Sequence, residues 1–361
     1  MSERVTMVIA CISAFALSFA LTFPIKKYIA PKLGFMDHPT DERRMHTDSI
    51  PRGGGVVVYV VFSLCALVFG HGRTALPYIL GGGIIVLCGL ADDRFSLKPW
   101  VKLVCQALAG VVLCFFDVTV EHLCAFNVII DTWIFEYPLT VLWVIAVTNA
   151  FNLIDGLDGL CSGITIISAG GVGLLALTNG HSEVFVCAML LMCSALGFLP
   201  HNVHPASIFL GDTGSMLFGF VMAAMCNDVT YVSDTAIPSL VAVTLIGVPV
   251  FDTTYAIVRR VYRKKHIMLG DKDHVHHVLS RRYSHPKAVV LIYLASIVCV
   301  GIALLMTGGV LCEVVGYILF VLSVGYGVLR FGIMLRRARC RAEQEAAIQG
   351  DCIRDDPTDE K

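Results

Sequence analysis

The stretch TVLWVIAVTNAFNLIDGLDGLCSGITIISAGGVGLLAL, residues 140–177, decides the fold of this chain. Two apolar runs, each near the ~20 residues that cross the hydrocarbon core of a bilayer, flank a short polar segment with two Asp and two Asn. Carboxylates near the membrane edge are tolerated chiefly where they face a hydrated cleft, a partner or a cation. The stretch therefore predicts two membrane-spanning helices that meet at a polar site.

The composition of the whole chain indicates an integral membrane protein. Of its 361 residues, 56% are hydrophobic and 15% are charged, and the mean hydropathy is +0.76. Soluble domains have about 25% charged and about 45–50% apolar residues, so this balance excludes an ordinary soluble domain. The 14 Cys are mostly isolated in apolar runs. They lack the paired spacing of zinc or disulfide sites, and we interpret them as packing residues.

We expect an all-α, polytopic fold with about eleven transmembrane helices. The apolar runs start near Val5, Gly54, Ala75, Trp100, Tyr137, Leu160, Glu183, Ser207, Ile237, Ala288 and Val310. The first run, Val5–Phe23, lacks a basic segment before it and is long enough to span, which favours a retained helix over a cleaved signal peptide. Between the fourth and fifth runs, AFNVIIDTWIFE (125–136) is β-branched and partly alternating, which predicts a short hairpin outside the bilayer.

The distribution of Lys and Arg predicts the orientation in the membrane. Eleven spans place on one side the C-terminal tail and the connections 24–53, 91–99, 149–159, 200–206 and 259–287. When the helix edge with Lys102 and the C-terminal end from Arg330 onward are included, all of the 27 basic residues except Arg4 and Arg73 fall on that side. The positive-inside rule makes this side cytoplasmic. The N-terminus is then outside and the C-terminus cytoplasmic. We expect residues 1–335 to form a single polytopic membrane domain and residues 336–361 to form a polar cytoplasmic tail.

Five polar motifs fall on this cytoplasmic side, in loops or at helix ends. They are DHPTDERRMHTDSIPRGGG (37–55), ADDR (91–94), NAFNLIDGLDGL (149–160), IFLGDTGSM (208–216) and GDKDHVHHV (270–278). Membrane-edge carboxylates need water, a partner or a cation. Their common location therefore predicts an active site in one cytoplasmic-face cleft that can bind a metal ion.

The adjacent carboxylates of Asp92 and Asp93 suit a metal ion or a base. Two neighbouring carboxylates repel each other when both are ionised. A divalent ion that binds oxygen ligands relieves this repulsion, and without an ion the pKa of one carboxyl rises so that it can act as a base. The structural alternative is a helix cap or an ion pair with Arg94.

A second motif places four polar side chains at three-residue steps, Asn149, Asn152, Asp155 and Asp158. On a helix, successive pairs of this set share a face, so that the set can line a cleft. The alternative is packing between polar helices, with Gly156 and Gly159 permitting close approach.

The segment IFLGDTGSM places Asp212 among two Gly and two hydroxyl residues just before an apolar span. Free backbone N–H groups at a helix start bind phosphate, and Asp212 would hold the metal ion that neutralises it. A plain N-cap by Asp212 or Thr213 is the alternative.

Three histidines crowd one short basic segment, His274, His276 and His277. They could bind zinc, but no Cys is near them and no H-E-x-x-H pattern occurs. We favour a loop that, together with Lys272, binds an anionic substrate. Attraction to lipid headgroups is a third alternative.

The first polar loop carries Arg43, Arg44, His46 and Arg52 ahead of the glycines at 53–55. These cations serve equally well as a topology anchor. The three consecutive glycines favour a binding role, because they let the backbone approach a ligand closely.

Taken together, these motifs resemble one known family. The patterns H-P-T-x-x-R-x-x-H with P-R-x-G-G, D-D-R, N-x-x-N-x-x-D-G-x-D-G, G-D-x-G-S and H-x-H-H occur in this order from His38 to His277. In combination they are similar to the polyprenyl-phosphate N-acetylhexosamine-1-phosphate transferase family, in its WecA/TagO branch, which is related to MraY.

The resemblance implies an enzyme of the bacterial cytoplasmic (inner) membrane. It would transfer N-acetylglucosamine-1-phosphate from UDP-N-acetylglucosamine to an undecaprenyl-type phosphate and release UMP, the first membrane step of a cell-envelope polysaccharide pathway. The implied cofactor is Mg²⁺, with Mn²⁺ as an alternative. Expected partners are the UDP-sugar donor, the polyprenyl-phosphate acceptor and membrane lipids, without nucleic acid, and a homodimer is left open.

The family pattern also implies roles for individual residues. The candidate catalytic residues are Asp92, Asp93, Asp155 and Asp158. The candidate metal ligands are Asn152 and Asp212. The candidate substrate-binding residues are Arg43, His46, Arg52, Phe209, Lys272, His274, His276 and His277.

An ion or metabolite transporter is the competing class of function. Carboxylates at the membrane edge and a His-rich segment also occur in cation pathways. Transporters, however, usually place ionisable groups near the midplane, often in related halves. Here the carboxylates lie at one face and no halves repeat, so we expect an enzyme.

Overall fold

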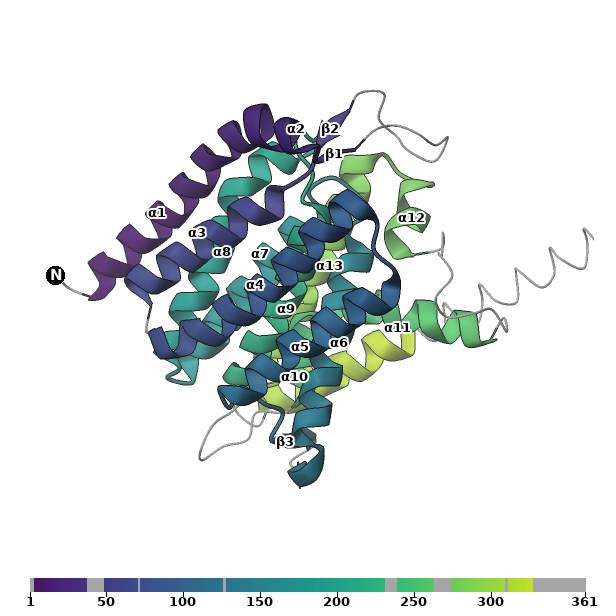
Figure 1. Cartoon of the computed structure of the whole chain (residues 1–361). Coiled ribbons are helices and arrows are strands. Elements are labelled where there is room, and N and C mark those ends of the chain that lie inside the picture. The colour runs from purple at the N-terminus through teal and green to yellow at the C-terminus, as the bar shows by residue number, and fades with distance from the viewer. Residues whose placement is uncertain are drawn as a thin grey trace, which may run out of the picture. The chain divides into compact units, whose positions relative to one another are not determined.

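The computed structural model describes residues 3–37, 49–70, 72–125, 128–230, 239–262, 274–308 and 311–326. The chain divides into two units, Met1–Thr307 and Gly308–Lys361. In the first unit the described residues form a bundle of helices with two very short antiparallel sheets (Figure 1). In the second, the described part is one apolar helix, Leu311–Tyr326. The predicted boundary at residue 335 lies outside the described residues.

The elements follow one another along the chain in the order that Figure 1 labels. The helices are α1 (Glu3–Pro24), α2 (Ala30–Leu33), α3 (Gly54–Phe69), α4 (Gly72–Phe95), α5 (Pro99–Phe115), α6 (Glu136–Ile154), α7 (Leu160–Thr178), α8 (Ser182–Asn202), α9 (Gly211–Thr230), α10 (Ser239–Leu245), α11 (Gly247–Tyr262), α12 (Val275–Ser280) and α13 (His285–Leu305). The strands are β1 (Met36–Asp37), β2 (Ile50–Pro51), β3 (His122–Ala125) and β4 (Val128–Asp131).

The expectation of an all-α membrane protein is confirmed. Among the described residues, six helices are long and apolar enough to cross a membrane: Arg4–Leu33, Gly72–Phe95, Trp133–Ile154, Leu160–Thr178, Ser182–Asn202 and His285–Leu305. The helices α10 and α11 together make a seventh candidate, which bends by 91° at their junction. The helices α3, α5 and Leu311–Tyr326 are apolar but shorter. The number of eleven spans and the orientation stay predictions.

Two boundaries differ from the sequence-based expectation. Residues 24–33 were expected in a loop, but the first helix continues through a π-helical turn, Ile25–Ile29, and α2 before it ends at Gly34 in the left-handed conformation. Lys26 and Lys27 end the apolar run but not the helix, because lysine is a good helix former. The Lys26 Nζ lies 3.3 Å from His201 Nδ1 and 3.1 Å from Ser207 Oγ. The span expected from Ser207 corresponds to α9, which starts only at Gly211 and is not among the candidate membrane spans of the described residues.

The predicted hairpin is confirmed, although it starts earlier than the stretch 125–136. Strands β3 and β4 pair in antiparallel register, with His122 opposite Asp131, and a 3-10 turn, Trp133–Phe135, follows them. Strand β3 lies at the opposite end of the first unit from α2 and α12 (Figure 1). The polar motifs gather at the end that holds α2 and α12.

Helix α9 forms the centre of the first unit. All of its residues from Thr213 to Val229 except Asp228 are buried, and it packs against α3, α4, α6 and α7 (Figure 1). An apolar helix that is covered on every side is expected in the core rather than at the lipid surface. Its first turn carries the Asp212 motif into the interior of the polar end.

Glycines allow the helix ends to meet at this point. A Cβ atom on Gly55 of α3 would collide with the backbone of Gly214 in α9, and a Cβ atom on Gly89 of α4 would collide with the backbone of Thr213. Small residues at helix interfaces permit such close backbone approach in membrane proteins. The starts of α3 and α9 and the end of α4 are thereby held in direct contact.

We expect Gly55→Ala to destabilise the protein because the new methyl group has no space against Gly214. Overpacking of this kind costs about 1–3 kcal/mol, and the apparent midpoint of thermal unfolding in detergent should fall. Gly301→Ala is the matched control, because a Cβ atom there meets nothing within 4 Å. Equal midpoints for the two variants would contradict the close contact between α3 and α9.

Candidate active site

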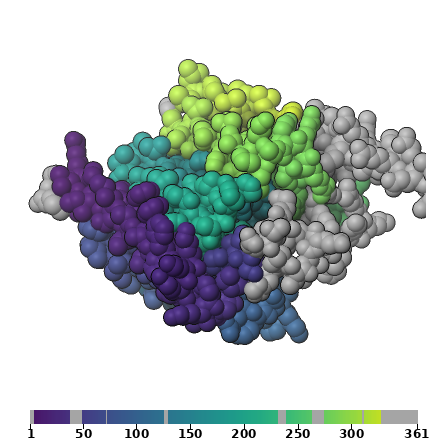
Figure 2. Space-filling model, turned by 90° about the horizontal axis from the view of Figure 1, so that it is seen from above, coloured from purple at the N-terminus to yellow at the C-terminus, as the bar shows by residue number. Residues whose placement is uncertain are grey.

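The polar end brings together segments from distant parts of the chain. Seen from above, segments of the first third, the middle and the last third of the chain lie next to one another on this face (Figure 2). Arg52 and Phe209 form an isolated parallel β-bridge. The amides of Gly54 and Gly55 donate to the carbonyls of Phe209 and Leu210, both at 3.1 Å. These glycine amides were expected to approach a ligand, but they join the first and fourth motifs instead.

Asp93 caps the start of α9 from the end of α4. Its carboxylate accepts hydrogen bonds from the amides of Asp212 at 3.0 Å and Thr213 at 3.2 Å, and from Thr213 Oγ1 at 2.7 Å. Arg52 Nη1 lies 3.5 Å from the same carboxylate, and the Asp93 side chain is only 1% exposed. A carboxylate at a helix N-terminus satisfies free amides and interacts favourably with the helix dipole.

This cap corrects two expectations for the segment IFLGDTGSM. The amides of Asp212 and Thr213 are not free for a phosphate, because Asp93 already accepts from both. The alternative of a local N-cap by Asp212 or Thr213 is also wrong, because the capping carboxylate comes from another helix. The sequence could not reveal this cap, since its partners lie more than a hundred residues apart.

Lys102 joins two carboxylates at the centre of the site. Its Nζ lies 2.6 Å from Asp92 Oδ2 and 2.6 Å from Asp212 Oδ2. The three side chains come from α4, α5 and α9 and are only partly exposed, at 12% for Asp92, 20% for Lys102 and 29% for Asp212. Charge-assisted hydrogen bonds of this kind are stronger than neutral ones.

Lys102 was not among the residues selected from the sequence. It stands in the first turns of an apolar helix, outside the five polar motifs, where it was counted only for membrane orientation. The signal that could have found it is its position, since a Lys inside an apolar helix needs a partner.

Asn152 also reaches this cluster. Its Nδ2 donates at 3.0 Å to the Oγ of Ser215, which follows Asp212 by three residues in the first turn of α9. Asn149, one turn earlier on α6, pairs instead with Gln106, with Nδ2 2.6 Å from Gln106 Oε1. The predicted metal ligands Asn152 and Asp212 therefore lie together, and Asn149 has a packing role.

Of the four polar residues that were expected to share a helix, only the two asparagines lie on it. Helix α6 ends at Ile154, and the connection to α7 contains both Asp155 and Asp158. The residue after the helix, Asp155, is no longer helical, with ψ 53°. Gly159, just before α7, has a positive φ of 75°, which glycine tolerates at no steric cost. The loop is anchored where Asn202 Oδ1 accepts from the Gly159 amide at 3.2 Å.

Asp155 is half-buried in this loop and faces the charged cluster. Burial raises the pKa of its carboxyl well above the usual range, and the nearby carboxylates of Asp212 and Asp93 raise it further. Arg52 opposes this shift. A carboxylic acid of raised pKa next to ionised carboxylates is typical of catalytic sites and of sites that bind a cation.

Asp158 points to a different set of partners. Its Oδ2 lies 2.7 Å from His204 Nδ1 and accepts from the Ala206 amide at 3.2 Å. The backbone N–H of Asp158 donates to His285 Nε2 at 3.1 Å. Although only two residues separate the two aspartates, Asp158 is held by α13 and the segment after α8.

The histidine motif forms the start of a short helix rather than a loop. His274 precedes α12, and its buried ring lies with Nδ1 3.0 Å from Asp252 Oδ2. The same carboxylate accepts from the Val275 amide at 2.8 Å. His277 is half-buried. The group of possible metal ligands found among the described residues does not include these histidines.

His276 lies directly over the D-G-L-D-G loop. A Cβ atom on Gly156 would collide with the His276 imidazole. Burial, together with the neighbouring His277, lowers the pKa of His276 to about 3. The His276 imidazole thus covers the loop that carries Asp155, and the predicted binding of an anionic substrate by the histidine motif stays a prediction. Arg43, His46 and Lys272 lie outside the described residues.

Arg52 has protein partners on both sides. In addition to Asp93, its Nη2 lies 2.8 Å from Asp37 Oδ1. Phe209, the other predicted substrate-binding residue of this region, is half-buried beside it. Both residues lie at the margin of the carboxylate cluster.

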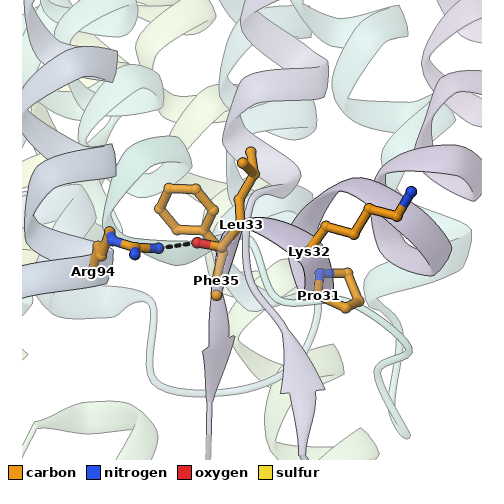
Figure 3. A pocket seen from close by; sticks show the side chains of 6 residues that line it. Pro31, Lys32, Leu33, Phe35 and Arg94 are labelled. Atoms are coloured by element: carbon orange, nitrogen blue, oxygen red, sulfur yellow. Dashed lines mark hydrogen bonds between the residues drawn. The ribbon is translucent and has the colours of Figure 1, made fainter.

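A cavity of about 480 Å³ lies beside the end of α4. It is lined by Pro31, Lys32, Leu33, Gly34, Phe35 and Arg94. The Arg94 guanidinium donates to the carbonyl of Leu33, and Lys32 points away from it (Figure 3). Arg94 thus fastens the first helical segment to α4 instead of pairing with Asp92 or Asp93.

The chain is similar to several bacterial proteins of known name. The sequence profile of glycosyl transferase family 4 matches residues 75–230. A probable undecaprenyl-phosphate N-acetylglucosaminyl 1-phosphate transferase of Bacillus subtilis is 35% identical over 302 residues, which cover 81% of this chain and 83% of that protein. A decaprenyl-phosphate N-acetylglucosaminephosphotransferase of Mycolicibacterium smegmatis is 33% identical over 305 residues, 74% of each chain. An undecaprenyl-phosphate alpha-N-acetylglucosaminyl 1-phosphate transferase of Escherichia coli is 29% identical over 316 residues, 84% of this chain and 83% of that protein.

We expect Asp155→Asn to stabilise the protein at neutral and alkaline pH. Because the pKa of Asp155 is raised in the folded chain, folding stability falls as the pH rises from the usual pKa of Asp to the raised value. Asn removes this loss, so the apparent unfolding midpoint at about pH 8 should rise by about 2 °C. At roughly pH 4 the two proteins should unfold alike. A lower midpoint for the variant at about pH 8 would show that the surroundings favour the charged form.

Lys102→Met is expected to destabilise the protein because it leaves two partly buried carboxylates without their cation. Removal of one partner from a buried charge cluster costs about 3–5 kcal/mol, and partial exposure reduces this to about 1–3 kcal/mol. The midpoint of thermal unfolding measures the loss. Lys98→Met, at an exposed lysine just before the same helix, should change the midpoint little, and a similar loss in both variants would argue against the bridge.

Proposed function

This chain belongs to the polyprenyl-phosphate N-acetylglucosamine-1-phosphate transferases of glycosyl transferase family 4. We propose that it transfers N-acetylglucosamine-1-phosphate from UDP-N-acetylglucosamine to a polyprenyl phosphate and releases UMP. The relatives' names support this donor and this class of acceptor and favour the enzyme over the transporter alternative. Relatives that use undecaprenyl and decaprenyl phosphates are both similar to this chain, so the polyprenol length stays open.

The observation that carries the proposal is the cluster of Asp92, Lys102 and Asp212 at the start of α9. Three charged side chains from three helices meet at one end of an otherwise apolar bundle. Phosphoryl transfer asks a protein mainly to align the reacting groups and to neutralise their charge. Two carboxylates and a lysine at the polar end supply groups for both tasks.

The donor set of this cluster fits Mg²⁺. The Lys102 ammonium already stands as a cation between two carboxylate oxygens, and Mg²⁺ prefers oxygen ligands from one or two carboxylates. We assign Asp212 and the amide oxygen of Asn152 as its protein ligands, with Asp92 beside them. When bound, Mg²⁺ would supply charge neutralisation to the pyrophosphate of the donor. Mn²⁺ would bind the same oxygen set.

In the reaction, a phosphate oxygen of the lipid forms a bond to the β-phosphorus of the UDP-sugar. The bond from this phosphorus to the oxygen that bridges to the α-phosphate breaks, and UMP leaves with that oxygen. Asp92 takes up a proton from the lipid phosphate or orients it. Asp93 is the positioning residue, because its carboxylate is engaged by α9 and Arg52.

The remaining site residues would bind the donor. We assign Phe209 to stack on uracil and Asp155 to line the nucleotide pocket, next to the metal site. Lys102 would move from Asp92 and Asp212 toward the phosphates as charge develops there. Arg52 lies at the margin of the cluster, and His277 lies beside His276. Both would contact the sugar or its phosphate.

We place the reaction at the cytoplasmic face of a bacterial inner membrane. The support is the gathering of basic residues on the side of the polar motifs, together with the bacterial origin of the relatives. The product would be the first lipid-linked sugar of a cell-envelope polysaccharide.

The test is UMP release by the purified protein with UDP-N-acetylglucosamine, a polyprenyl phosphate and Mg²⁺. We expect Asp92→Asn to lower kcat by about 10²–10⁴-fold, the usual contribution of a positioned acid or base. Asp212→Asn should also lower kcat, because it removes a carboxylate ligand of the proposed metal ion. Asp117→Asn, at an exposed aspartate after α5, should leave it unchanged. The unfolding midpoint of each variant shows whether it is folded. Absence of UMP release from the wild type with either Mg²⁺ or Mn²⁺ would reject the proposed function.

A further inference from the structure

A second cluster of ligating side chains lies on the far side of the D-G-L-D-G loop. It consists of Asp158 from the connection between α6 and α7, His204 after α8, and His285 at the start of α13. One nitrogen of each histidine and one Asp158 oxygen lie within 4.8 Å of one another. The proposed transfer reaction uses neither histidine.

The two imidazoles are arranged face to face around the carboxylate. Their ring centroids are 4.2 Å apart, with an interplanar angle of 21°. The His204 Nδ1 lies 2.7 Å from Asp158 Oδ2. The Asp158 amide donates to the lone pair of His285 Nε2 at 3.1 Å, so the proton of the neutral ring is on Nδ1, and a metal ion at Nε2 would take the place of this amide. A metal ion binds histidine as the neutral imidazole and aspartate as the carboxylate.

One ring nitrogen of His285 has no hydrogen-bond partner among the described residues. This atom, Nδ1, is buried. The His204 side chain is 43% exposed, which leaves an entry path from solvent. A buried polar atom without a partner is uncommon in a folded protein.

We propose that Asp158, His204 and His285 form a binding site for a transition-metal ion of the Zn²⁺ class, separate from the Asp92 and Asp212 cluster. Two imidazoles and one carboxylate are a known protein ligand set for Zn²⁺, with ligand distances of about 2.0–2.2 Å and a fourth position left open. Mg²⁺ prefers oxygen ligands, so the two imidazoles select against it. On binding, the cation replaces the proton between His204 and Asp158.

A cation at this site would join three separate segments of the fold. It would link the loop after α6, the segment after α8 and the start of α13. The same loop carries Asp155 toward the Asp212 cluster, three residues before Asp158. The metal ion would therefore fix the position of Asp155, without being part of the transfer reaction itself.

The experiment uses the purified full-length protein, freed of metal and titrated with Co²⁺, whose visible absorption reports tetrahedral coordination. We expect His204→Ala and His285→Ala each to weaken this Co²⁺ site by more than about tenfold, since even residues behind the ligands contribute about 10–100-fold. Zn²⁺ should displace the bound Co²⁺, and an excess of Mg²⁺ should not. An unchanged Co²⁺ titration in both variants would overturn the proposal.

His122→Ala is the matched control. His122 has the same side-chain exposure of 43% as His204, and its Nδ1 lies 2.9 Å from Asp131. It lacks a third ligand among the described residues. We expect this variant to keep the Co²⁺ site of the wild type. An equal loss in the His122 and His204 variants would show that Co²⁺ binds to histidine–aspartate pairs in general, and would overturn the proposal.

His204→Cys tests direct ligation even if the alanine variants fold poorly. A cysteine that replaces His204 as a ligand should add a sulfur-to-cobalt charge-transfer band that the wild type lacks. If the variant is folded and saturated with Co²⁺ but lacks this band, His204 is not a ligand. Neither readout depends on transferase activity, so the metal site and the proposed function can fail independently.

Discussion

The site depends on one interaction, the cap that Asp93 of α4 places on the first turn of α9. The carboxylate is almost completely buried and accepts three hydrogen bonds from Asp212 and Thr213. Because a helix start leaves amides without partners, its burial in an apolar bundle needs an acceptor from elsewhere. Asp93 provides it, and it thereby fixes how α4 and α9 meet.

The cap also explains why two neighbouring aspartates differ in their surroundings. Successive residues on a helix point about 100° apart, so with Asp93 directed at α9 the Asp92 side chain turns toward α5 and meets Lys102. The glycine contacts between α3, α4 and α9 keep these backbones close enough for the arrangement. One aspartate thus holds the helices together, and the other remains available for chemistry.

Sequence reasoning identified the membrane class, the helix-end position of Asp92 and Asp93, the hairpin and the common location of the polar motifs. It succeeded there because hydropathy and helix-ending residues are local properties. It missed Lys102 and the cap by Asp93, since both depend on contacts between distant helices. It also mistook the surroundings of His276, because local composition does not show that this imidazole lies buried against Gly156. Residues 24–33 were mistaken for a loop because the apolar run ends at Phe23, whereas the helix continues through lysines that are good helix formers.

The position of Lys102 has a consequence for how the resting protein meets divalent ions. Its ammonium group already balances part of the negative charge of Asp92 and Asp212. A divalent ion that binds these carboxylates must therefore displace the Lys102 ammonium. Such an exchange gains little electrostatic energy by itself. It becomes favourable when a diphosphate enters with the ion and offers the displaced lysine a new anionic partner. The resting protein would then hold its metal ion weakly, and loading would be coupled to the arrival of the nucleotide.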